Sequence, residues 1–271
     1  MSAPPPGWDA HVHVFDEAAP VVPGHYRPDH HPLAEIEALA AAHGVGHLVL
    51  VQPSVYGTDN ALLLRALARE PGRHRGVVVV DADIDEATLD AMHAAGVRGV
   101  RFNLVSPVGE RATPATPQVR FAALAPKLRQ RGWHVQWYVP REQLGTVLAL
   151  HQGPGLGLPC VLDHLAGLRA DTAPDDTAWP TLSALAGLGA WIKLSGWYRL
   201  GAAEPYTALQ PLVERVVRLF GPRCVWGSDW PHTSFARAAM PTYASTWQPV
   251  VAALGETRAE ALRRARPAIY D

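Results

Sequence analysis

Short apolar runs alternate with longer amphipathic segments from one end of this 271-residue chain to the other. The apolar runs have the length of strands, and they are Trp8–Phe15, His47–Gln52, Gly76–Val80, Val97–Asn103, Trp133–Val139, Cys160–His164, Trp191–Ser195 and Cys224–Asp229. The segments that follow them show helical periodicity, and they are Leu33–His43, Asn60–Arg69, Asp85–Ala95, Gln118–Arg131, Arg141–Leu150, Ala178–Ala186, Tyr206–Phe220 and Tyr243–Arg266. Repeated strand–helix units predict a parallel α/β architecture. Eight units in a chain of this length predict a single (β/α)8 TIM barrel, with one domain over residues 1–271.

The structural competitor is an open, doubly wound parallel sheet. Such sheets carry a glycine-rich loop after the first strand when they bind dinucleotides. This chain has neither the G-x-G-x-x-G pattern nor a Walker sequence. The sequence therefore favours the closed barrel and argues against a nucleotide ligand.

Charge and composition argue against several classes of partner. A formal net charge of -1, without basic clusters interleaved with aromatics, gives no attraction to nucleic acid or to an anionic membrane. No apolar run has the length of a membrane span, and the first residues lack the pattern of a secretory signal. We therefore expect a cytoplasmic protein in which Cys160 and Cys224 are free, buried thiols. Barrel surfaces often form dimers, so a homodimer is a further expectation, although no exposed apolar stripe is legible.

Two histidines one residue apart, His11 and His13, lie toward the end of the first apolar run. Successive side chains of a strand alternate between its faces, so both imidazoles project to the same side. In a parallel barrel, the interior at the carboxyl ends of the strands is where active sites form. There the pair either binds a metal ion or forms hydrogen bonds to a substrate oxygen.

Polar residues gather at the carboxyl ends of the other predicted strands as well. They are Gln52, Ser54, Tyr56, Arg101, Asn103, Gln136, Tyr138, Asp163, His164, Ser195 and Asp229. Burying so many polar groups without partners is costly, so their concentration at one end predicts a site. Lys193 lies in the middle of its strand, where an internal ion pair is favoured over Schiff-base chemistry. Arg101 and Arg199 form a candidate clamp for a carboxylate, with a structural role as the alternative.

Six motifs follow one another in order along the predicted strands. They are Asp9-Ala10-His11-Val12-His13-Val14-Phe15, Gln52-Pro53-Ser54-Val55-Tyr56-Gly57, Gly99-Val100-Arg101-Phe102-Asn103, Leu162-Asp163-His164, Lys193-Leu194-Ser195-Gly196 and Gly227-Ser228-Asp229-Trp230-Pro231-His232. Together they resemble the amidohydrolase superfamily, and within it the branch that contains lactonases. The resemblance runs from the first strand to the eighth and implies the distorted TIM barrel of that superfamily.

The resemblance implies a catalytic set of four residues. His11 and His13 match the histidine pair of the first strand. His164 matches the histidine of the sixth strand, and Asp229 matches the aspartate of the eighth. Where metal-binding members have a histidine at the end of the fifth strand, this chain has Gln136 and Tyr138. A lactonase of the branch that shares this departure works without a divalent metal. The resemblance therefore favours no cofactor, and the alternative is one zinc or manganese ion on the four residues of the set.

The resemblance also implies contacts with the substrate. The positions that hold a dicarboxylate in this branch are matched by Ser54, Tyr56, Arg101, Tyr138 and Arg199, and Asn103 shares the face of Arg101. Pro107 stands where the branch has a further arginine, and Arg111 lies farther along the same loop. This departure widens the expected substrates from a pyrone dicarboxylate to sugar lactones and muconolactones.

The residue types themselves support hydrolysis. Asp229 is a suitable general base for a water molecule, and the three histidines can polarise an ester carbonyl. The two arginines would orient a substrate through its carboxylate. We therefore predict a hydrolase that opens a small carboxylated lactone. The alternatives are a zinc-dependent lactonase, a metal-dependent decarboxylase of the same superfamily, and a barrel that only binds carboxylates.

Overall fold

The computed structural model describes residues 3–22, 27–105, 116–233, 235 and 237–271. Its strands form a single sheet in which each strand pairs in parallel with the next one along the chain. The strands are β1 (Gly7–Val12), β2 (Val45–Val51), β3 (Arg75–Val78), β4 (Val97–Asn103), β5 (His134–Tyr138), β6 (Cys160–Leu162), β7 (Trp191–Leu194) and β8 (Cys224–Trp226). Valine-rich runs such as β2 suit a sheet that is covered on both faces.

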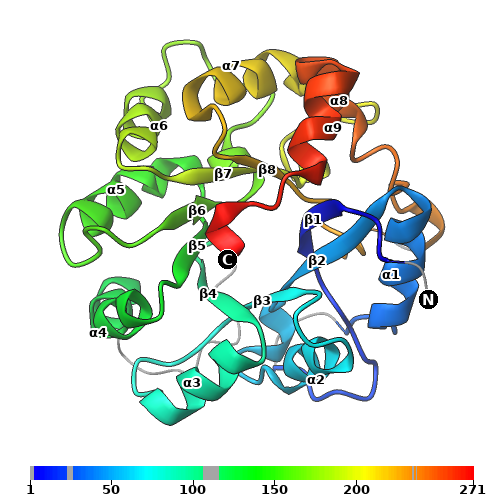
Figure 1. Ribbon diagram of the computed structural model, residues 1–271. Helices are drawn as coiled ribbons and strands as arrows, with labels where there is room; N and C mark the ends of the chain where they lie inside the picture. The colour runs from blue at the N-terminus through cyan, green and yellow to red at the C-terminus, as the bar shows by residue number, and fades with distance from the viewer. Residues whose placement is uncertain (1–2, 23–26, 106–115, 234, 236) are drawn as a thin grey trace.

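Helices follow the strands and surround the sheet (Figure 1). They are α1 (Leu33–Ala42), α2 (Ala61–Arg69), α3 (Glu86–Ala94), α4 (Pro117–Gln130), α5 (Leu144–Gln152), α6 (Ala178–Gly187), α7 (Gln210–Phe220), α8 (Gln248–Leu254) and α9 (Glu256–Arg264). The predicted (β/α)8 barrel is confirmed, but its last helical segment is two helices because Gly255, with a φ of 73°, ends α8. Within the described ranges, no helix combines the length and the apolar composition that a membrane span requires.

The barrel closes through hydrogen bonds between β1 and the segment after β8. The Asp229 N–H donates to the His11 carbonyl at 2.9 Å, and the His13 N–H donates to the Trp230 carbonyl at 2.9 Å. These bonds extend the sheet beyond the last residue of β8. The residues that join the two ends of the sheet are thus the residues that carry candidate catalytic side chains.

Most strands end earlier than the apolar runs predict, and at three of them this places a predicted site residue beyond the strand. β1 ends at Val12, β6 at Leu162 and β8 at Trp226, so that His13, His164 and Asp229 lie just beyond them. His164 has a φ of 49° and Asp229 a φ of 62°, which is left-handed backbone that no strand contains. For a non-glycine residue this conformation costs roughly 1–2 kcal/mol. The strand ends are therefore bent away from the sheet where the predicted site begins, and such strain is typical of functional sites.

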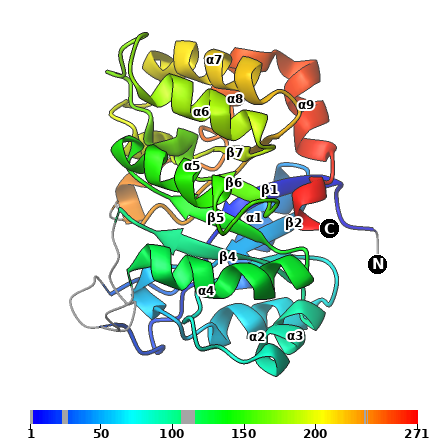
Figure 2. The same cartoon turned by 90° about the vertical axis from the view of Figure 1, so that its left-hand side faces the viewer.

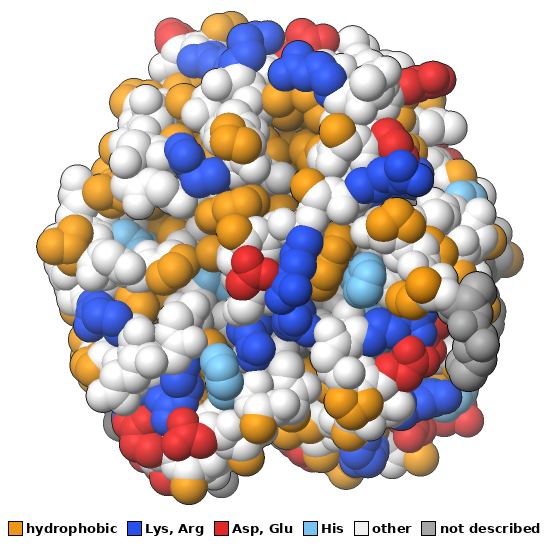
Figure 3. All heavy atoms as spheres, in the orientation of Figure 1, with side chains coloured by type: hydrophobic (Ala, Val, Ile, Leu, Met, Phe, Trp, Pro, Cys, Tyr) orange, Lys and Arg blue, Asp and Glu red, His pale blue; other side chains and the backbone are white. Residues whose placement is uncertain are grey.

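The amino ends of the strands enclose an apolar interior. Its residues are Trp8, Ala10, Val49, Val51, Val77, Val161, Val225, Ile269 and Tyr270. The C-terminal residues close this end of the barrel, where Figure 1 places the chain end near the centre. Arg75 Nε donates to the Tyr270 carbonyl at 2.9 Å and Arg98 Nε donates to the Asp271 carbonyl at 2.8 Å. Figure 3 shows basic side chains at the centre of this face, and Figure 2 shows the same end of the barrel from the side.

Histidine burial in the outer core gives a prediction for stability. His151 of α5 is buried, its Nε2 accepts a hydrogen bond from Trp137 Nε1 at 2.9 Å, and burial lowers its pKa from 6.5 to about 4. In the unfolded chain the imidazole titrates near its ordinary value. Between pH 6.5 and pH 4 the unfolded chain therefore takes up a proton that the folded protein does not, and stability falls as pH falls.

A His151→Gln variant removes this titration while it keeps an acceptor for the Trp137 indole. Urea unfolding between pH 7 and pH 4 should show that the variant loses up to about 3 kcal/mol less than the wild type over this range. All other titrating groups are shared by the two proteins, so the difference between the two slopes isolates His151. Equal slopes would contradict the prediction.

Candidate active site

Asp229 lies at the centre of a buried cluster of imidazoles. Its Oδ1 is 3.6 Å from His11 Nε2, 3.6 Å from His13 Nε2 and 3.8 Å from His164 Nε2. Among the described residues this oxygen has no hydrogen-bond partner. The structure thus brings together the four residues of the predicted catalytic set and leaves one carboxylate oxygen available to a ligand.

The other oxygen of Asp229 is held firmly. Tyr198 Oη donates to Oδ2 at 2.7 Å, and Arg199 Nε donates to it at 2.9 Å. Burial alone would raise the pKa of Asp229, but the Arg199 guanidinium holds it well below its usual range. Asp229 is therefore a carboxylate at neutral pH, fixed through Oδ2 and open at Oδ1.

A second buried carboxylate, Asp163, lies deeper in the barrel. Its Oδ2 accepts hydrogen bonds from Arg101 Nε at 3.2 Å and from Gln136 Nε2 at 3.0 Å. Its Oδ1 is 3.4 Å from Lys193 Nζ and 3.3 Å from His11 Nδ1. The predicted internal ion pair of Lys193 is confirmed. Burial lowers the pKa of Lys193 to about 8, so this side chain is largely charged at neutral pH.

Two imidazoles of the cluster, those of His11 and His164, are neutral at neutral pH. Burial lowers the pKa of His11 well below its ordinary value and lowers that of His164 to about 4. His13 Nδ1 donates to the Val51 carbonyl at 2.7 Å, because a carbonyl can only accept, so in a neutral His13 ring the lone pair lies on Nε2. His164 Nδ1 is hydrogen-bonded to Ser195 Oγ at 2.9 Å.

The fixed charges of the site leave one positive charge uncompensated. Its carboxylates are Asp163 and Asp229, and its cations are Arg101, Lys193 and Arg199. Within these ion pairs, which do not include Asp9, three cations against two carboxylates leave one positive charge in excess. An anionic substrate is the ligand that such a site attracts.

An irregularity in β1 directs His11 into this network. The pairing of β1 with β2 shifts register between Asp9 and Val12, and a bulge of this kind re-aims a side chain. Asp9 holds the bent segment: its Oδ1 accepts from the His11 N–H at 3.1 Å and the Ser228 N–H at 2.9 Å. Burial raises the pKa of Asp9 to about 6. The alternation of side chains along the strand could not predict this role, because Asp9 binds backbone N–H groups.

The structure places the predicted substrate residues in two groups. Tyr138 lies in the cluster, with its ring 5.0 Å from that of His164 and 5.2 Å from the Arg101 guanidinium carbon. Tyr56 and Ser54 form a 3₁₀ turn after β2, where the Tyr56 hydroxyl donates to the Asp16 carbonyl at 3.1 Å. Asn103 Oδ1 accepts from the Val105 N–H at 3.1 Å. The substrate contacts expected of these residues stay predictions, and Pro107 and Arg111 lie outside the described residues.

Two side chains of the site were not singled out by the sequence. Tyr198 binds Asp229, and its position just before Arg199 in a 3₁₀ turn follows no strand alternation. His232 is buried with its ring 5.4 Å from that of Tyr198, and burial lowers its pKa to about 4. His232 does stand at the end of the last sequence motif, so the signal for it was present.

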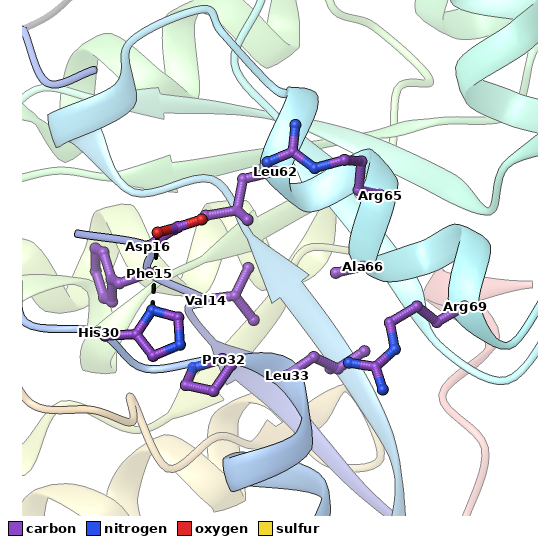
Figure 4. Close-up of a pocket in the computed structure, with 10 residues that line it drawn as sticks. All are labelled: Val14, Phe15, Asp16, His30, Pro32, Leu33, Leu62, Arg65, Ala66 and Arg69. Carbon is purple, nitrogen blue, oxygen red and sulfur yellow. Dashed lines mark ion pairs between the residues drawn. The ribbon is translucent and has the colours of Figure 1, made fainter. Parts of the chain in front are cut away.

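A separate pocket of about 280 Å³ borders the site (Figure 4). Its lining residues are Val14, Phe15, Asp16, His30, Pro32, Leu33, Leu62, Arg65, Ala66 and Arg69. None of the four residues of the predicted catalytic set lines it. Phe15 connects the two regions, because its ring is 6.0 Å from that of His13. This pocket is therefore a neighbour of the candidate active site and not its centre.

Three of the buried side chains have the spacing of a metal site. Ligand atoms of His11, His164 and Asp229 lie within 4.8 Å of one another. Imidazole and carboxylate are ligands that zinc takes in enzymes. An imidazole binds a metal only through a nitrogen with a lone pair, and the partner of its other nitrogen decides where that lone pair is. The distances within the cluster fit a divalent ion. The positions of the imidazole protons decide whether the nitrogens have the lone pairs that would bind it.

The family model for amidohydrolases matches residues 8–262. The chain therefore belongs to the amidohydrolase family, and the predictions of this family and of an enzyme of the hydrolase class are confirmed.

Named relatives and a solved structure agree with this assignment. The chain is 31% identical over 238 residues to a 2-pyrone-4,6-dicarboxylate hydrolase of Comamonas testosteroni, with 83% of this chain and 76% of the relative covered. It is 29% identical over 238 residues to a 4-sulfomuconolactone hydrolase of Hydrogenophaga intermedia, with 86% and 77% covered. A crystal structure from Pseudomonas putida, described as a 2-pyrone-4,6-dicarboxylic acid hydrolase, superimposes with a TM-score of 0.84 at 31% identity over 97% of each chain.

Glycine at the end of β7 gives a test of the site geometry. A Cβ on Gly196 would lie 2.4 Å from His164 Nδ1, and its φ is +65°. Gly189 has a φ of +89° but nothing within 4 Å of such a Cβ, so it is a matched control for backbone strain. Both alanine variants should lose about 1 kcal/mol of stability. Only Gly196→Ala should also lose about 100-fold in hydrolytic rate, because its methyl group displaces the imidazole. Equal rates in the two variants would show that the position of His164 is unimportant.

Proposed function

We propose that the protein hydrolyses the ester bond of a lactone that carries a carboxylate. The observation that carries the proposal is the unpartnered Oδ1 of Asp229, which faces three imidazoles inside a site of net positive charge. The names of the two relatives, a pyrone dicarboxylate hydrolase and a sulfomuconolactone hydrolase, support a lactone with acidic groups.

Water attack begins at Asp229. Its Oδ1 takes a proton from a water molecule as the water oxygen bonds to the lactone carbonyl carbon, and the carbonyl oxygen gains the negative charge. Imidazole N–H groups in the cluster stabilise this oxyanion. The low pKa of Asp229 makes it a weak base, so the proton passes on to His13 Nε2, the lone pair of which lies 3.6 Å away.

Ring opening completes the reaction. The tetrahedral centre re-forms its carbonyl, and the bond between that carbon and the ring oxygen breaks. The departing oxygen receives the proton that was taken from water. The product therefore carries one new carboxyl group and one new hydroxyl group, and the enzyme returns to its starting state.

Two arginines orient the substrate in this scheme. Arg101 and Arg199 each use Nε to bind a buried aspartate, and no hydrogen bond among the described residues uses their terminal nitrogens. Those nitrogens can bind a carboxylate in a bidentate manner. Tyr138 lies beside both His164 and Arg101 and would contact the same substrate. We propose Ser54, Tyr56 and Asn103 as further substrate contacts on the strength of the motifs alone.

The identity of the base gives a direct prediction. Asp229→Asn should lower kcat by about 1,000-fold, because the amide cannot accept the proton, and should leave KM nearly unchanged. Proton release with a panel of pyrone dicarboxylates, muconolactones and sugar lactones measures both quantities. Asp171→Asn is the control, since the Asp171 side chain is 76% exposed. Turnover near that of the wild type in Asp229→Asn would refute the proposal, and carboxylates that raise Tm without any turnover would indicate a binding protein.

A zinc-dependent lactonase is the second candidate, and the spacing of the cluster favours it. A bound divalent ion would polarise the carbonyl and lower the pKa of a water molecule. We expect dialysis against a chelator to leave the rate of hydrolysis unchanged. Loss of activity that one equivalent of zinc restores would assign the second candidate instead.

A further inference from the structure

Lys193 makes a contact with His11 that decides where the imidazole proton lies. Both side chains are fully buried. Lys193 Nζ donates to Gln136 Oε1 at 2.7 Å and lies 3.2 Å from His11 Nδ1. An ammonium group has three hydrogens and no lone pair, so it can only donate. In this contact, therefore, His11 Nδ1 is the acceptor and carries no proton.

The competing arrangement has His11 Nδ1 protonated and donating to Asp163. The distance from Nδ1 to Asp163 Oδ1 is 3.3 Å, but that oxygen has no hydrogen-bond partner among the residues that the structure describes. A proton on Nδ1 would also face the ammonium hydrogens of Lys193 across 3.2 Å. The charge of Asp163 is compensated without His11, by Arg101 at 3.2 Å and Lys193 at 3.4 Å.

We propose that Lys193 is a positioning residue that locks His11 in the tautomer with its proton on Nε2. A neutral imidazole has one N–H, and here it faces Asp229 Oδ1 at 3.6 Å. Neither His11 Nε2 nor Asp229 Oδ1 has a hydrogen-bond partner among the described residues. A donor and an acceptor are thus aimed at the same space, where an oxygen of the substrate or of water can meet both.

The two histidines of the first strand then have opposite chemistry. In its neutral form, His13 presents a lone pair at Nε2, because its Nδ1 donates to the Val51 carbonyl at 2.7 Å. His11 presents an N–H, because its Nδ1 accepts from Lys193. A metal held by both would need lone pairs on both. The cluster therefore does not fit a metal through His11, although the distances allow one, and in the proposed lactonase His11 donates to the oxyanion.

Nitrogen NMR tests the tautomer without any variant of Lys193. Protein labelled with 15N-histidine should show, for His11, a protonated Nε2 and an unprotonated Nδ1, and a His11→Gln sample identifies its signals. A protonated Nδ1 on His11 in the wild type would overturn the proposal. This measurement needs no turnover, so its failure is distinct from failure of the proposed lactonase activity.

Replacing Lys193 tests whether its ammonium group fixes the tautomer of His11. In Lys193→Met, the proton of His11 can move from Nε2 to Nδ1, where it faces Asp163, and Nε2 gains a lone pair. Calorimetric titration with zinc chloride should then show one site in the variant, which Lys193→Met/Asp229→Asn loses, and none in the wild type. Lys127→Met is the matched control, because Lys127 lies on α4 and is the other lysine of the chain.

Two results would overturn the role of the lysine. One is a zinc site in the wild type that His11→Gln removes. The other is a folded Lys193→Met variant in which the His11 spectrum is unchanged and no zinc binds. If Lys193→Met does not fold, the spectrum of the wild type still decides the tautomer.

Discussion

The pairing of two buried carboxylates with cations inside the barrel is the constraint on which the rest of the site depends. An isolated charge at either position would be prohibitively costly, and each aspartate is instead held at one oxygen by an arginine. Asp163 and Asp229 then turn their second oxygens toward His11. The same pairing therefore holds the carboxylates that face His11, while burial keeps the imidazoles of His11 and His164 neutral.

The arginines show why a structural role and a functional role need not exclude each other. The sequence left open whether Arg101 and Arg199 bind a substrate or support the fold. Each arginine supports the fold through its Nε, which binds a buried aspartate. The guanidinium has further donors on its far side. One side chain can thus stabilise a buried carboxylate and still present a fork to another carboxylate in the pocket.

Alternation of apolar runs was enough to predict the barrel, and parity was enough to place His11 and His13 on one side. Parity fails where the backbone leaves the strand: Tyr198 lies in a 3₁₀ turn, and Asp229 has left-handed backbone. The proton positions were also beyond the sequence, because partners on other strands set them. No local pattern around His11 signals that a lysine from β7 donates to it.

The join between β1 and the segment after β8 has a consequence for the folding of the chain during synthesis. His11 and Asp229 meet only when the first strand is joined to the segment after the last one, through backbone bonds that these residues themselves make. A growing chain that lacks β8 has the three imidazoles and Asp163 but not the carboxylate of Asp229 between them. The cluster around Asp229 is therefore complete only when the barrel is closed.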